Sequence, residues 1–356
     1  MNFGIIITDI NTRAGTERAV SNLSNLLATH KHNVYIISID SCSGSGAYEL
    51  KNGVFIIHLN IGLVKASKIK KISCYKKLLA ELKNNIKKYD LDYIIGTYSS
   101  INILLPMFRK QTKTIGCEHF NFNSANKFHK LLRFMFYRKL DAVVVLTKQD
   151  AVHYSFINEK HLFVIPNSLS FERNYKDIYS QKRVISIGRL SKQKGFDILI
   201  DVVEQISKRI SDWKFTIVGD GELREILKKK IYEKKLEDLI DIIPPTNSVL
   251  DIYNSASIYL MTSRWEGLPM VLLEAQACGL PIVSFDCPEG PASVIHNEKD
   301  GFLIDFMDVT NMVNKLEILM NNYELRKNFG VSAFEASSYY SPENVYLLWE
   351  NLLKNI

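Results

Sequence analysis

Short apolar runs alternate with helical patterns along the first 170 residues of the chain. The apolar runs predict strands, at residues 3–8, 33–39, 53–59, 93–97, 112–117, 142–147 and 162–166. Apolar positions at helical spacing predict helices between most of them, at residues 16–30, 68–88, 101–109, 127–140 and 148–156. Strands and helices that alternate in this way are typical of a parallel sheet covered by helices on both faces.

After a polar stretch at residues 172–182 the alternation starts again. Strands are predicted at residues 183–187, 213–218, 239–243, 257–261 and 281–285, with helices at 196–210, from 222, at 248–255, after 269 and near the end of the chain. The sequence therefore predicts an α/β protein with two doubly wound, Rossmann-like domains facing across a cleft. We assign residues 1–175 to the first domain, 176–340 to the second and 341–356 to a final helix. Ligands of such folds bind beyond the carboxyl ends of the strands.

Composition and charge narrow the class of protein. The apolar fraction of 46% and the charged fraction of 23% are those of an ordinary soluble protein, and no apolar run approaches the length of a membrane span. The start of the chain does not resemble a signal peptide, and its five cysteines are scattered, which favours the reduced cytosol over a disulfide framework or a zinc site. Residues 1–170 hold 23 Lys and Arg against 11 Asp and Glu, which predicts an anionic partner for the first half.

Two segments, residues 64–79 and 127–139, concentrate this positive charge. Both mix basic residues with apolar ones, and such helices can lie on an anionic membrane surface. The alternative is that the apolar faces pack in the core and the lysines are merely solvated. We find no nucleic-acid-binding signature beside the charge.

Glu266 and Glu274 bracket a Gly-Leu-Pro turn that opens an apolar helix. Pro269 suits the first helical position, and Gly279 followed by Pro281 predicts where the helix ends. The start of such a helix presents unpaired N–H groups and the positive end of its dipole, which suits a phosphate. Ionised carboxylates accept hydrogen bonds from vicinal hydroxyls of a sugar or a ribose. Taken alone, such a motif is more often a capped surface helix with two solvated acids.

Three further glycine-containing loops follow predicted strands. Gly15 lies in a turn after the first strand, where backbone N–H groups could cradle a phosphate or a sugar. Gly188–Gly195 contains Arg189 and Lys194, two cations that could hold a diphosphate, and residues 218–223 contain Gly219 and Asp220. Each loop alone could be an ordinary turn. Their position at equivalent strand ends points to one ligand site in the second domain.

Together, Gly188-Arg189 with Lys194-Gly195, residues 218–221 and Glu266 to Glu274 resemble the retaining GT-B glycosyltransferases of family 4. The resemblance covers nearly the whole chain and is sharpest from residue 183 to residue 301. Asp286-Cys287-Pro288-Glu289-Gly290-Pro291 resembles the branch that builds bacterial capsule, exopolysaccharide and O-antigen.

The resemblance implies a role for each motif. Arg189 and Lys194 would bind the diphosphate of a nucleotide sugar, together with the loops of Gly188, Gly219 and Asp220. Glu274 would bind the ribose hydroxyls. Glu266 would contact the transferred sugar, and the N–H groups of Gly267 and Leu268 would lie near sugar and phosphate. Gly15 would lie beside the diphosphate, and His119 near the donor sugar. The final helix would cross back to the first domain.

Two departures from the family pattern stand out. Pro244-Pro245 replaces a common glycine in a loop beside the nucleobase, which leaves the base open, although a UDP-sugar is favoured. Ser293 replaces a frequent acidic residue, and we have no physical account of that change.

These features predict α-retaining transfer of a hexose or N-acetylhexosamine to a lipid-linked saccharide in surface polysaccharide synthesis. Glu266, His119, Arg189 and Lys194 are the expected catalytic residues, without cofactor or metal. The enzyme would be cytoplasmic and peripheral on the inner face of the cell membrane. Three alternatives remain: a glycosidase using Glu266 and Glu274, a nucleotide-sugar epimerase of the same fold, and a non-enzymatic module that binds membranes or polyanions.

Overall fold

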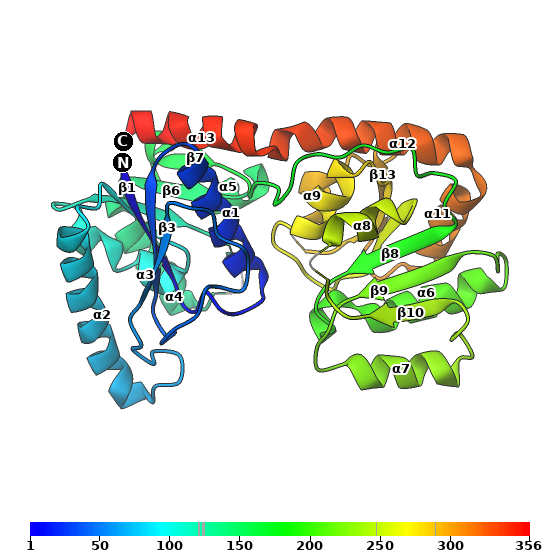
Figure 1. The fold of residues 1–356 in the computed structure, drawn as a ribbon, viewed down its shortest axis with the longest axis horizontal. Helices are drawn as coiled ribbons and strands as arrows, with labels where there is room; N and C mark the ends of the chain where they lie inside the picture. Colours follow the sequence, from blue (N-terminus) through cyan, green and yellow to red (C-terminus); the bar gives the residue numbers. More distant parts are fainter. Residues whose placement is uncertain (120–121, 123–124, 247, 289) are drawn as a thin grey trace. The chain divides into compact units, whose positions relative to one another are not determined.

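A computed structural model of the 356-residue chain describes all residues except 120–121, 123–124, 247 and 289. The chain forms two compact units, Met1–Ser168 with Pro342–Ile356, and Leu169–Ser341 (Figure 1). It passes between them at Ser168 and Leu169, somewhat before the predicted boundary at residues 175 and 176. It returns at Pro342, next to the predicted position.

The first unit contains a seven-stranded, fully parallel sheet in the order β3-β2-β1-β4-β5-β6-β7. Its strands are β1 (Asn2–Ile7), β2 (Asn33–Ser38), β3 (Val54–His58), β4 (Tyr93–Gly96), β5 (Lys113–Cys117), β6 (Ala142–Val145) and β7 (Leu162–Val164). All seven lie within predicted apolar runs or within one residue of them, because short, continuous apolar runs are what a sheet covered on both faces requires.

Helices cover both faces of this sheet. They are α1 (Gly15–Thr29), α2 (Lys68–Lys88), α3 (Ser99–Asn102), α4 (Lys127–Phe136), α5 (Lys148–Val152) and α13 (Pro342–Asn355), with the short turns η1 (Leu105–Phe108), η3 (Tyr137–Lys139) and η4 (Glu159–His161). Alternate residues of β1 point to opposite faces. Ile5 and Ile7 pack with α1 and α13, whereas Ile6 packs with α2. Figure 1 shows α1 and α2 on opposite sides of the sheet.

The second unit contains a six-stranded parallel sheet in the order β10-β9-β8-β11-β12-β13. Its strands are β8 (Arg183–Ile187), β9 (Lys214–Val218), β10 (Ile240–Ile243), β11 (Ile258–Met261), β12 (Ile282–Asp286) and β13 (Gly301–Asp305). Its helices are α6 (Phe196–Ser207), α7 (Arg224–Glu233), α8 (Val249–Asn254), α9 (Met270–Ala277), α10 (Pro291–Val294), α11 (Val309–Asn321) and α12 (Tyr323–Ala336), with η5 (Lys192–Lys194) and η6 (Ser337–Tyr340). The prediction of two parallel-sheet, Rossmann-like domains is confirmed.

Three local predictions were wrong. The sequence analysis missed β13, whose three apolar residues give no helix or strand periodicity of their own. The helix predicted at 101–109 is two short pieces, α3 and η1, because Pro106 cannot supply the N–H that a continuous helix needs there. Pro269 lies at the N-cap of α9, one position before the first helical residue.

Both sheets reverse their strand order at one point, between β1 and β4 and between β8 and β11. In such folds the ligand usually binds at this reversal point, beyond the carboxyl ends of the strands. Within the described part of the chain, no helix is both long and apolar enough to cross a membrane.

Candidate active site

The loop after β8, at the reversal point of the second sheet, packs against the loop after β9. The β8 loop lies against the β9 loop through the hydrogen bonds Gly188 N–H to Val218 O (3.0 Å) and Leu190 N–H to Asp220 O (2.9 Å). A Cβ added to Gly219 would lie 1.9 Å from the carbonyl oxygen of Gly188. Glycine is therefore required at position 219 for this backbone contact.

The same close approach joins two further loops. Gly195 has φ +65°, and its Cβ position lies 2.1 Å from the carbonyl oxygen of Thr262, just after β11. Gly290 has φ +106°, and its Cβ position lies 1.8 Å from the carbonyl oxygen of Gly267. Glycines thus bring the loops after β8, β9, β11 and β12 into backbone contact around one site.

Lys194 and Glu266 form an ion pair within this site. Nζ of Lys194 lies 2.7 Å from Oε1 of Glu266, and the two side chains are only 19% and 7% exposed. The Ser263 hydroxyl donates to the same carboxylate oxygen, at 2.7 Å. The structure therefore brings together two of the predicted catalytic residues, which are 72 positions apart in the sequence.

A second ion pair connects the loops that carry them. Arg264 donates two hydrogen bonds to the carboxylate of Asp197, in the first turn of α6, at 2.8 and 2.7 Å. It also donates to the carbonyl of Lys192, and the side chain of Gln193 donates to the carbonyl of Trp265. This pairing with Arg264 keeps the pKa of Asp197 below its usual range. These hydrogen bonds hold the loop that carries Lys194 against the loop that carries Glu266.

The turn between Glu266 and α9 presents free backbone donors. Among the residues that the structure describes, none accepts a hydrogen bond from the N–H groups of Gly267 or Leu268. Pro269, the N-cap of α9, provides no capping side chain. Free N–H groups at the start of a helix suit an anionic group.

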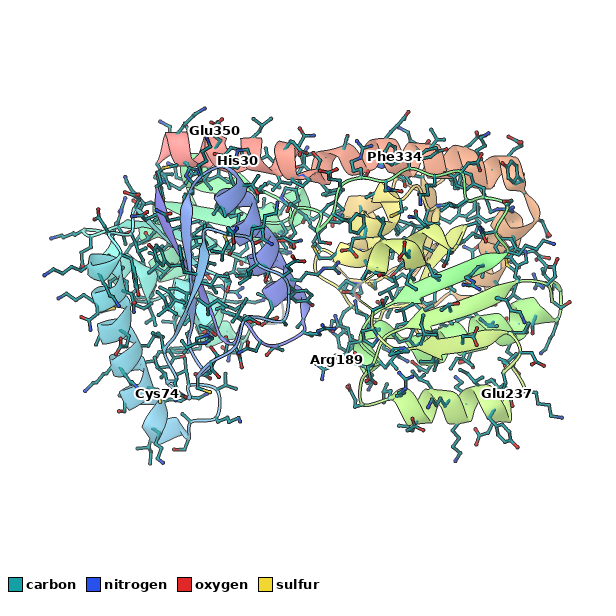
Figure 2. All side chains as sticks on the ribbon, in the orientation of Figure 1. His30, Cys74, Arg189, Glu237, Phe334 and Glu350 are labelled. Atoms are coloured by element: carbon teal, nitrogen blue, oxygen red, sulfur yellow. The ribbon has the colours of Figure 1, made fainter. Side chains whose placement is uncertain are left out.

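Arg189 and Asp220 lie nearer to solvent. The Arg189 side chain, labelled in Figure 2, is two-thirds exposed, with its Nε 3.6 Å from the exposed carboxylate of Glu222. Asp220 accepts from the N–H of Gly221 at 2.9 Å and lies 3.7 Å from Arg224. Such exposed pairs are weak, so the Arg189 side chain can turn to another anion at little cost.

Glu274 is fully buried in α9. Its two carboxylate oxygens accept hydrogen bonds from the Tyr253 hydroxyl (2.9 Å) and from the Ser170 hydroxyl (3.0 Å). The predicted contact with a ribose would therefore replace or join one of these hydroxyls.

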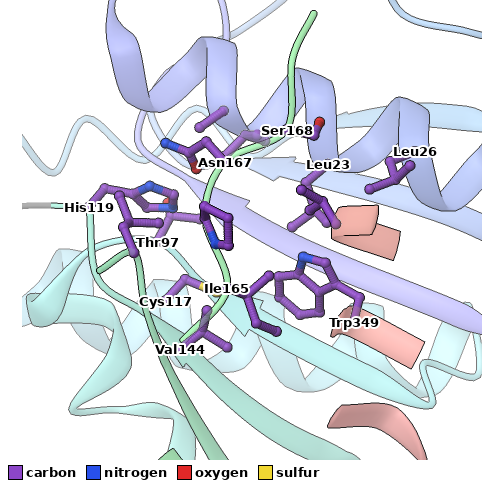
Figure 3. Close-up of a pocket in the computed structure, with 15 residues that line it drawn as sticks. Leu23, Leu26, Thr97, Cys117, His119, Val144, Ile165, Asn167, Ser168 and Trp349 are labelled. Atoms are coloured by element: carbon purple, nitrogen blue, oxygen red, sulfur yellow. The ribbon is translucent and has the colours of Figure 1, made fainter. Parts of the chain in front are cut away.

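His119 and Gly15 belong to the first unit. His119 follows β5 and lines a pocket together with Thr97, Asn167 and Trp349 (Figure 3). Figure 3 shows His119, Thr97 and Asn167 near one end of the pocket and the indole of Trp349 at the other. The pocket is otherwise mostly apolar, with the remaining lining from α1, the ends of β5 and β6, residues 165–168 and α13.

Burial lowers the pKa of His119 to about 4. Its Nδ1 is buried and has no hydrogen-bond partner in the described chain. The imidazole is therefore neutral near pH 7, and it can exchange hydrogen bonds with a sugar hydroxyl but supplies no positive charge.

Gly15 is the first residue of α1, and a Cβ added there would meet nothing within 4 Å. The preceding residue, Ala14, provides no capping side chain. Glu17, in the first turn, is buried and accepts from the Tyr98 hydroxyl at 3.1 Å, and this burial raises its pKa. Space beside the Gly15 backbone is thus available to a ligand.

The sequence analysis missed several residues that build the site. They are Ser263, Arg264, Asp197, Tyr253 and Ser170. Asp197, Tyr253 and Ser170 act across long sequence separations, so no local motif marks them. Only Ser263 and Arg264 carried a signal, because they directly precede the predicted motif.

Comparison with known proteins identifies the family. The model "Glycosyltransferase Family 4" matches residues 13–173, and the model "Glycosyl transferases group 1" matches residues 171–336. The amylovoran biosynthesis glycosyltransferase AmsD of Erwinia amylovora is 32% identical, over 98% of this chain and 98% of that protein. The chain belongs to glycosyltransferase family 4.

Two further proteins are similar over nearly the full length of the chain. A relative from Campylobacter jejuni is 28% identical over 100% of this chain and 99% of its own. Its name gives an α-1,4-N-acetyl-D-galactosaminyltransferase acting on a GalNAc-containing diNAcBac-PP-undecaprenol. The structure of the pneumococcal O-GlcNAc transferase GtfA with UDP and GlcNAc superposes with a TM-score of 0.82, covering 100% of this chain and 99% of that one at 14% identity. At that identity it shows the GT-B fold alone.

This glycosyltransferase has no evident metal centre in its described residues. No group of three or more His, Cys, Asp and Glu side chains gathers there in a way that could hold an ion. All five cysteines are free.

Proposed function

We propose that this family 4 enzyme transfers a hexose or N-acetylhexosamine from a nucleotide sugar, preferably a UDP-sugar, to a saccharide acceptor. The observation that carries the proposal is the partly buried Lys194–Glu266 pair beside the free N–H groups of Gly267 and Leu268. A cation and a helix start suit a leaving diphosphate, and an adjacent carboxylate suits the hydroxyls of the transferred sugar.

The transfer breaks the bond between the anomeric carbon and the diphosphate oxygen and forms a bond from that carbon to the acceptor oxygen. Negative charge grows on the diphosphate as it leaves, and Lys194, Arg189 and the N–H groups of Gly267 and Leu268 stabilise it. The departing phosphate oxygen takes the proton of the acceptor hydroxyl, so the reaction balances without a separate protein base. The new bond forms on the face of the leaving group, and the α-configuration is retained.

The other predicted residues orient the donor. Glu266 accepts hydrogen bonds from the sugar, and neutral His119 exchanges a hydrogen bond with it without adding charge. Glu274 accepts a hydrogen bond from a ribose hydroxyl, in place of the one that it accepts from the Ser170 hydroxyl in the structure. The loops of Gly188, Gly219 and Asp220, together with Gly15, approach the diphosphate. No cofactor or metal takes part in this scheme.

The relatives support the kind of acceptor. The name of the Erwinia protein places it in amylovoran biosynthesis, and that of the Campylobacter protein gives an undecaprenol-diphosphate-linked glycan as acceptor. We therefore propose a lipid-linked oligosaccharide as acceptor, in the synthesis of surface polysaccharide such as capsule or O-antigen. Such an acceptor would place the enzyme in the cytoplasm, peripherally on the inner face of the membrane.

The first test is a panel of UDP-, GDP- and ADP-sugars without acceptor, measuring thermal stabilisation and slow donor hydrolysis. Glu274→Gln is the matched variant, because it keeps the volume of a fully buried side chain. We expect one UDP-sugar to stabilise the wild type and to stabilise Glu274→Gln much less.

Three outcomes would contradict the proposal. Equal thermal stabilisation of wild type and Glu274→Gln by the donor would mean that Glu274 does not contact it. Conversion of the donor into its epimer would indicate an epimerase. No response to any nucleotide sugar, together with hydrolysis of glycosides, would favour a glycosidase.

A further inference from the structure

Helix α4 has an unusual distribution of side chains. Arg133 points inward and is 2% exposed, whereas Phe128, Leu131, Phe134 and Met135 are 67%, 53%, 41% and 50% exposed. Phe128, Leu131 and Met135 follow the spacing i, i+3 and i+7, so they form one stripe on the helix. We call these four exposed side chains the α4 face.

The inward arginine explains why the helix has this orientation. Arg133 lies 3.3 Å from the buried carboxylate of Glu118, which also accepts from the Tyr137 hydroxyl and from Asn102. Burial raises the pKa of Glu118, and Arg133 opposes that change. An unpaired buried charge is costly, so rotating α4 to bury its apolar stripe would leave Glu118 without its cation. The α4 face therefore stays outward.

Positive charge surrounds the α4 face. Residues 126–139 contain no acidic residue, and Lys127, Lys130, Arg138 and Lys139 are their remaining bases besides Arg133. The guanidinium of Arg138 lies 3.8 Å from the centre of the Phe134 ring. Lys127, at the start of α4, is exposed, and so are Arg138 and Lys139 in η3, directly after the helix.

We propose that the α4 face docks this enzyme onto an anionic lipid bilayer. Its apolar side chains enter the acyl boundary while the surrounding lysines and arginines meet the lipid headgroups. This inference rests on the proposed function, because a lipid-linked acceptor requires the enzyme at the membrane, and it names the element that brings it there.

The combination of positive charge and apolar side chains on the α4 face favours a bilayer over a second copy of the chain or a nucleic acid. Two copies of the α4 face would bring like charges together, which disfavours a symmetric dimer through this surface. A nucleic acid would use the positive charge but would leave Leu131 and Met135 without an apolar partner. An anionic bilayer satisfies both components at once.

The second basic segment behaves differently. In α2, Leu78, Leu82 and Ile86 are buried in the core, so the main apolar face of that helix is already covered. Ile69 and Ile72, near its start, remain exposed. This pair offers a control for the loss of two exposed apolar side chains, because its substitution leaves the α4 face unchanged.

The test is co-sedimentation of the full-length protein with vesicles of phosphatidylcholine, with and without phosphatidylglycerol. We expect wild type to bind only the anionic vesicles. Leu131→Ser with Met135→Ser should weaken binding by about 30-fold, because two apolar side chains lose their burial in lipid. Lys127→Ala with Lys139→Ala should weaken it by about 30-fold at low salt, at about 1 kcal/mol for each lysine. Ile69→Ser with Ile72→Ser should bind as wild type does.

Retained binding by the Leu131/Met135 variant would overturn the proposal, and so would a loss of binding confined to the Ile69/Ile72 variant. A wild-type dimer that dissociates in the Leu131/Met135 variant would assign the surface to a second copy instead. Thermal stabilisation by the donor should persist in every one of these variants, since none alters the donor site. Vesicle binding without any donor response would therefore reject the proposed function and leave the α4 assignment standing.

Discussion

The Lys194–Glu266 pair offers the sharpest test of the site, through a double-mutant cycle with Lys194→Met and Glu266→Gln. The two side chains lie 2.7 Å apart and are 19% and 7% exposed. Exposed ion pairs contribute about 0.2–1 kcal/mol, whereas removing one partner of a fully buried pair costs about 3–5 kcal/mol. With Ser263 still donating to the carboxylate, we expect Lys194→Met to lower the free energy of unfolding by about 2 kcal/mol.

The cycle isolates the pair from the other effects of each substitution. We expect Glu266→Gln alone to lower the free energy of unfolding and the double variant to lose less than the sum of the two. The expected coupling energy is about 1–2 kcal/mol. Urea denaturation followed by circular dichroism measures it, and donor turnover measures the functional effect. Turnover should fall by about 100-fold or more in Lys194→Met, as it does when one preorganised donor to a transition-state charge is removed.

The two readouts refute different parts of the reasoning. A coupling energy near zero would mean that the ion pair does not form in solution. An intact coupling energy with unchanged turnover in Lys194→Met would mean that the pair is structural and that the diphosphate binds elsewhere.

Three further predictions concern the glycines, the histidine and metal ions. Gly219→Ala should lower the free energy of unfolding by about 3 kcal/mol, because its Cβ would lie 1.9 Å from the carbonyl oxygen of Gly188. The control, Gly15→Ala, should change the free energy of unfolding by less than about 0.5 kcal/mol, since its Cβ would meet nothing within 4 Å. Urea denaturation of both variants tests the contact. The pKa of His119 is about 4 in the folded protein and about 6.5 in the unfolded chain. Below about pH 6.5 the unfolded chain therefore binds more protons, and the free energy of unfolding falls as the pH drops from about 6.5 to about 4. Wild type should therefore lose about 2 kcal/mol more than His119→Gln between pH 7 and pH 5, and equal losses would contradict the burial of this ring. Dialysis against EDTA should leave the transfer rate unchanged within about twofold, since cationic side chains and backbone N–H groups stabilise the diphosphate, and a loss restored by Mg²⁺ would contradict that scheme.

The sequence predicted the fold well because each strand of a doubly wound sheet is a short, mostly apolar segment flanked by turn residues. The runs at 33–39 and 183–187 became β2 and β8 almost unchanged. The strand Gly301–Asp305 was not predicted because its continuous apolar run is only three residues long, and so short a run fits a helix, a strand or a loop equally well.

The site was predictable to the level of its loops. Motifs with Gly188, Lys194 and Glu266 mark strand ends by local sequence alone. The contacts between them depend on which strands are neighbours in the sheet, so the Lys194–Glu266 distance and the Arg264–Asp197 pair could not be derived from spacing.

The environments of single side chains were less predictable still. Glu274 was expected to bind a ribose, yet its complete burial beneath Tyr253 and Ser170 depends on residues up to 104 positions away. The inward Arg133 reverses the usual assignment of inside and outside on a helix, because a buried acid on another element outweighs the apolar pattern. Roles that depend on a ligand remain predictions for all the site residues.

The most direct measurement of the central claim is NMR analysis of a complete reaction, with the stabilising nucleotide sugar and a lipid-linked saccharide acceptor. We predict one released nucleoside diphosphate for each sugar transferred and an α-configured new linkage from an α-configured donor, both absent in Lys194→Met. A β-linked product, or release of the diphosphate with free sugar alone in the presence of a competent acceptor, would contradict the account.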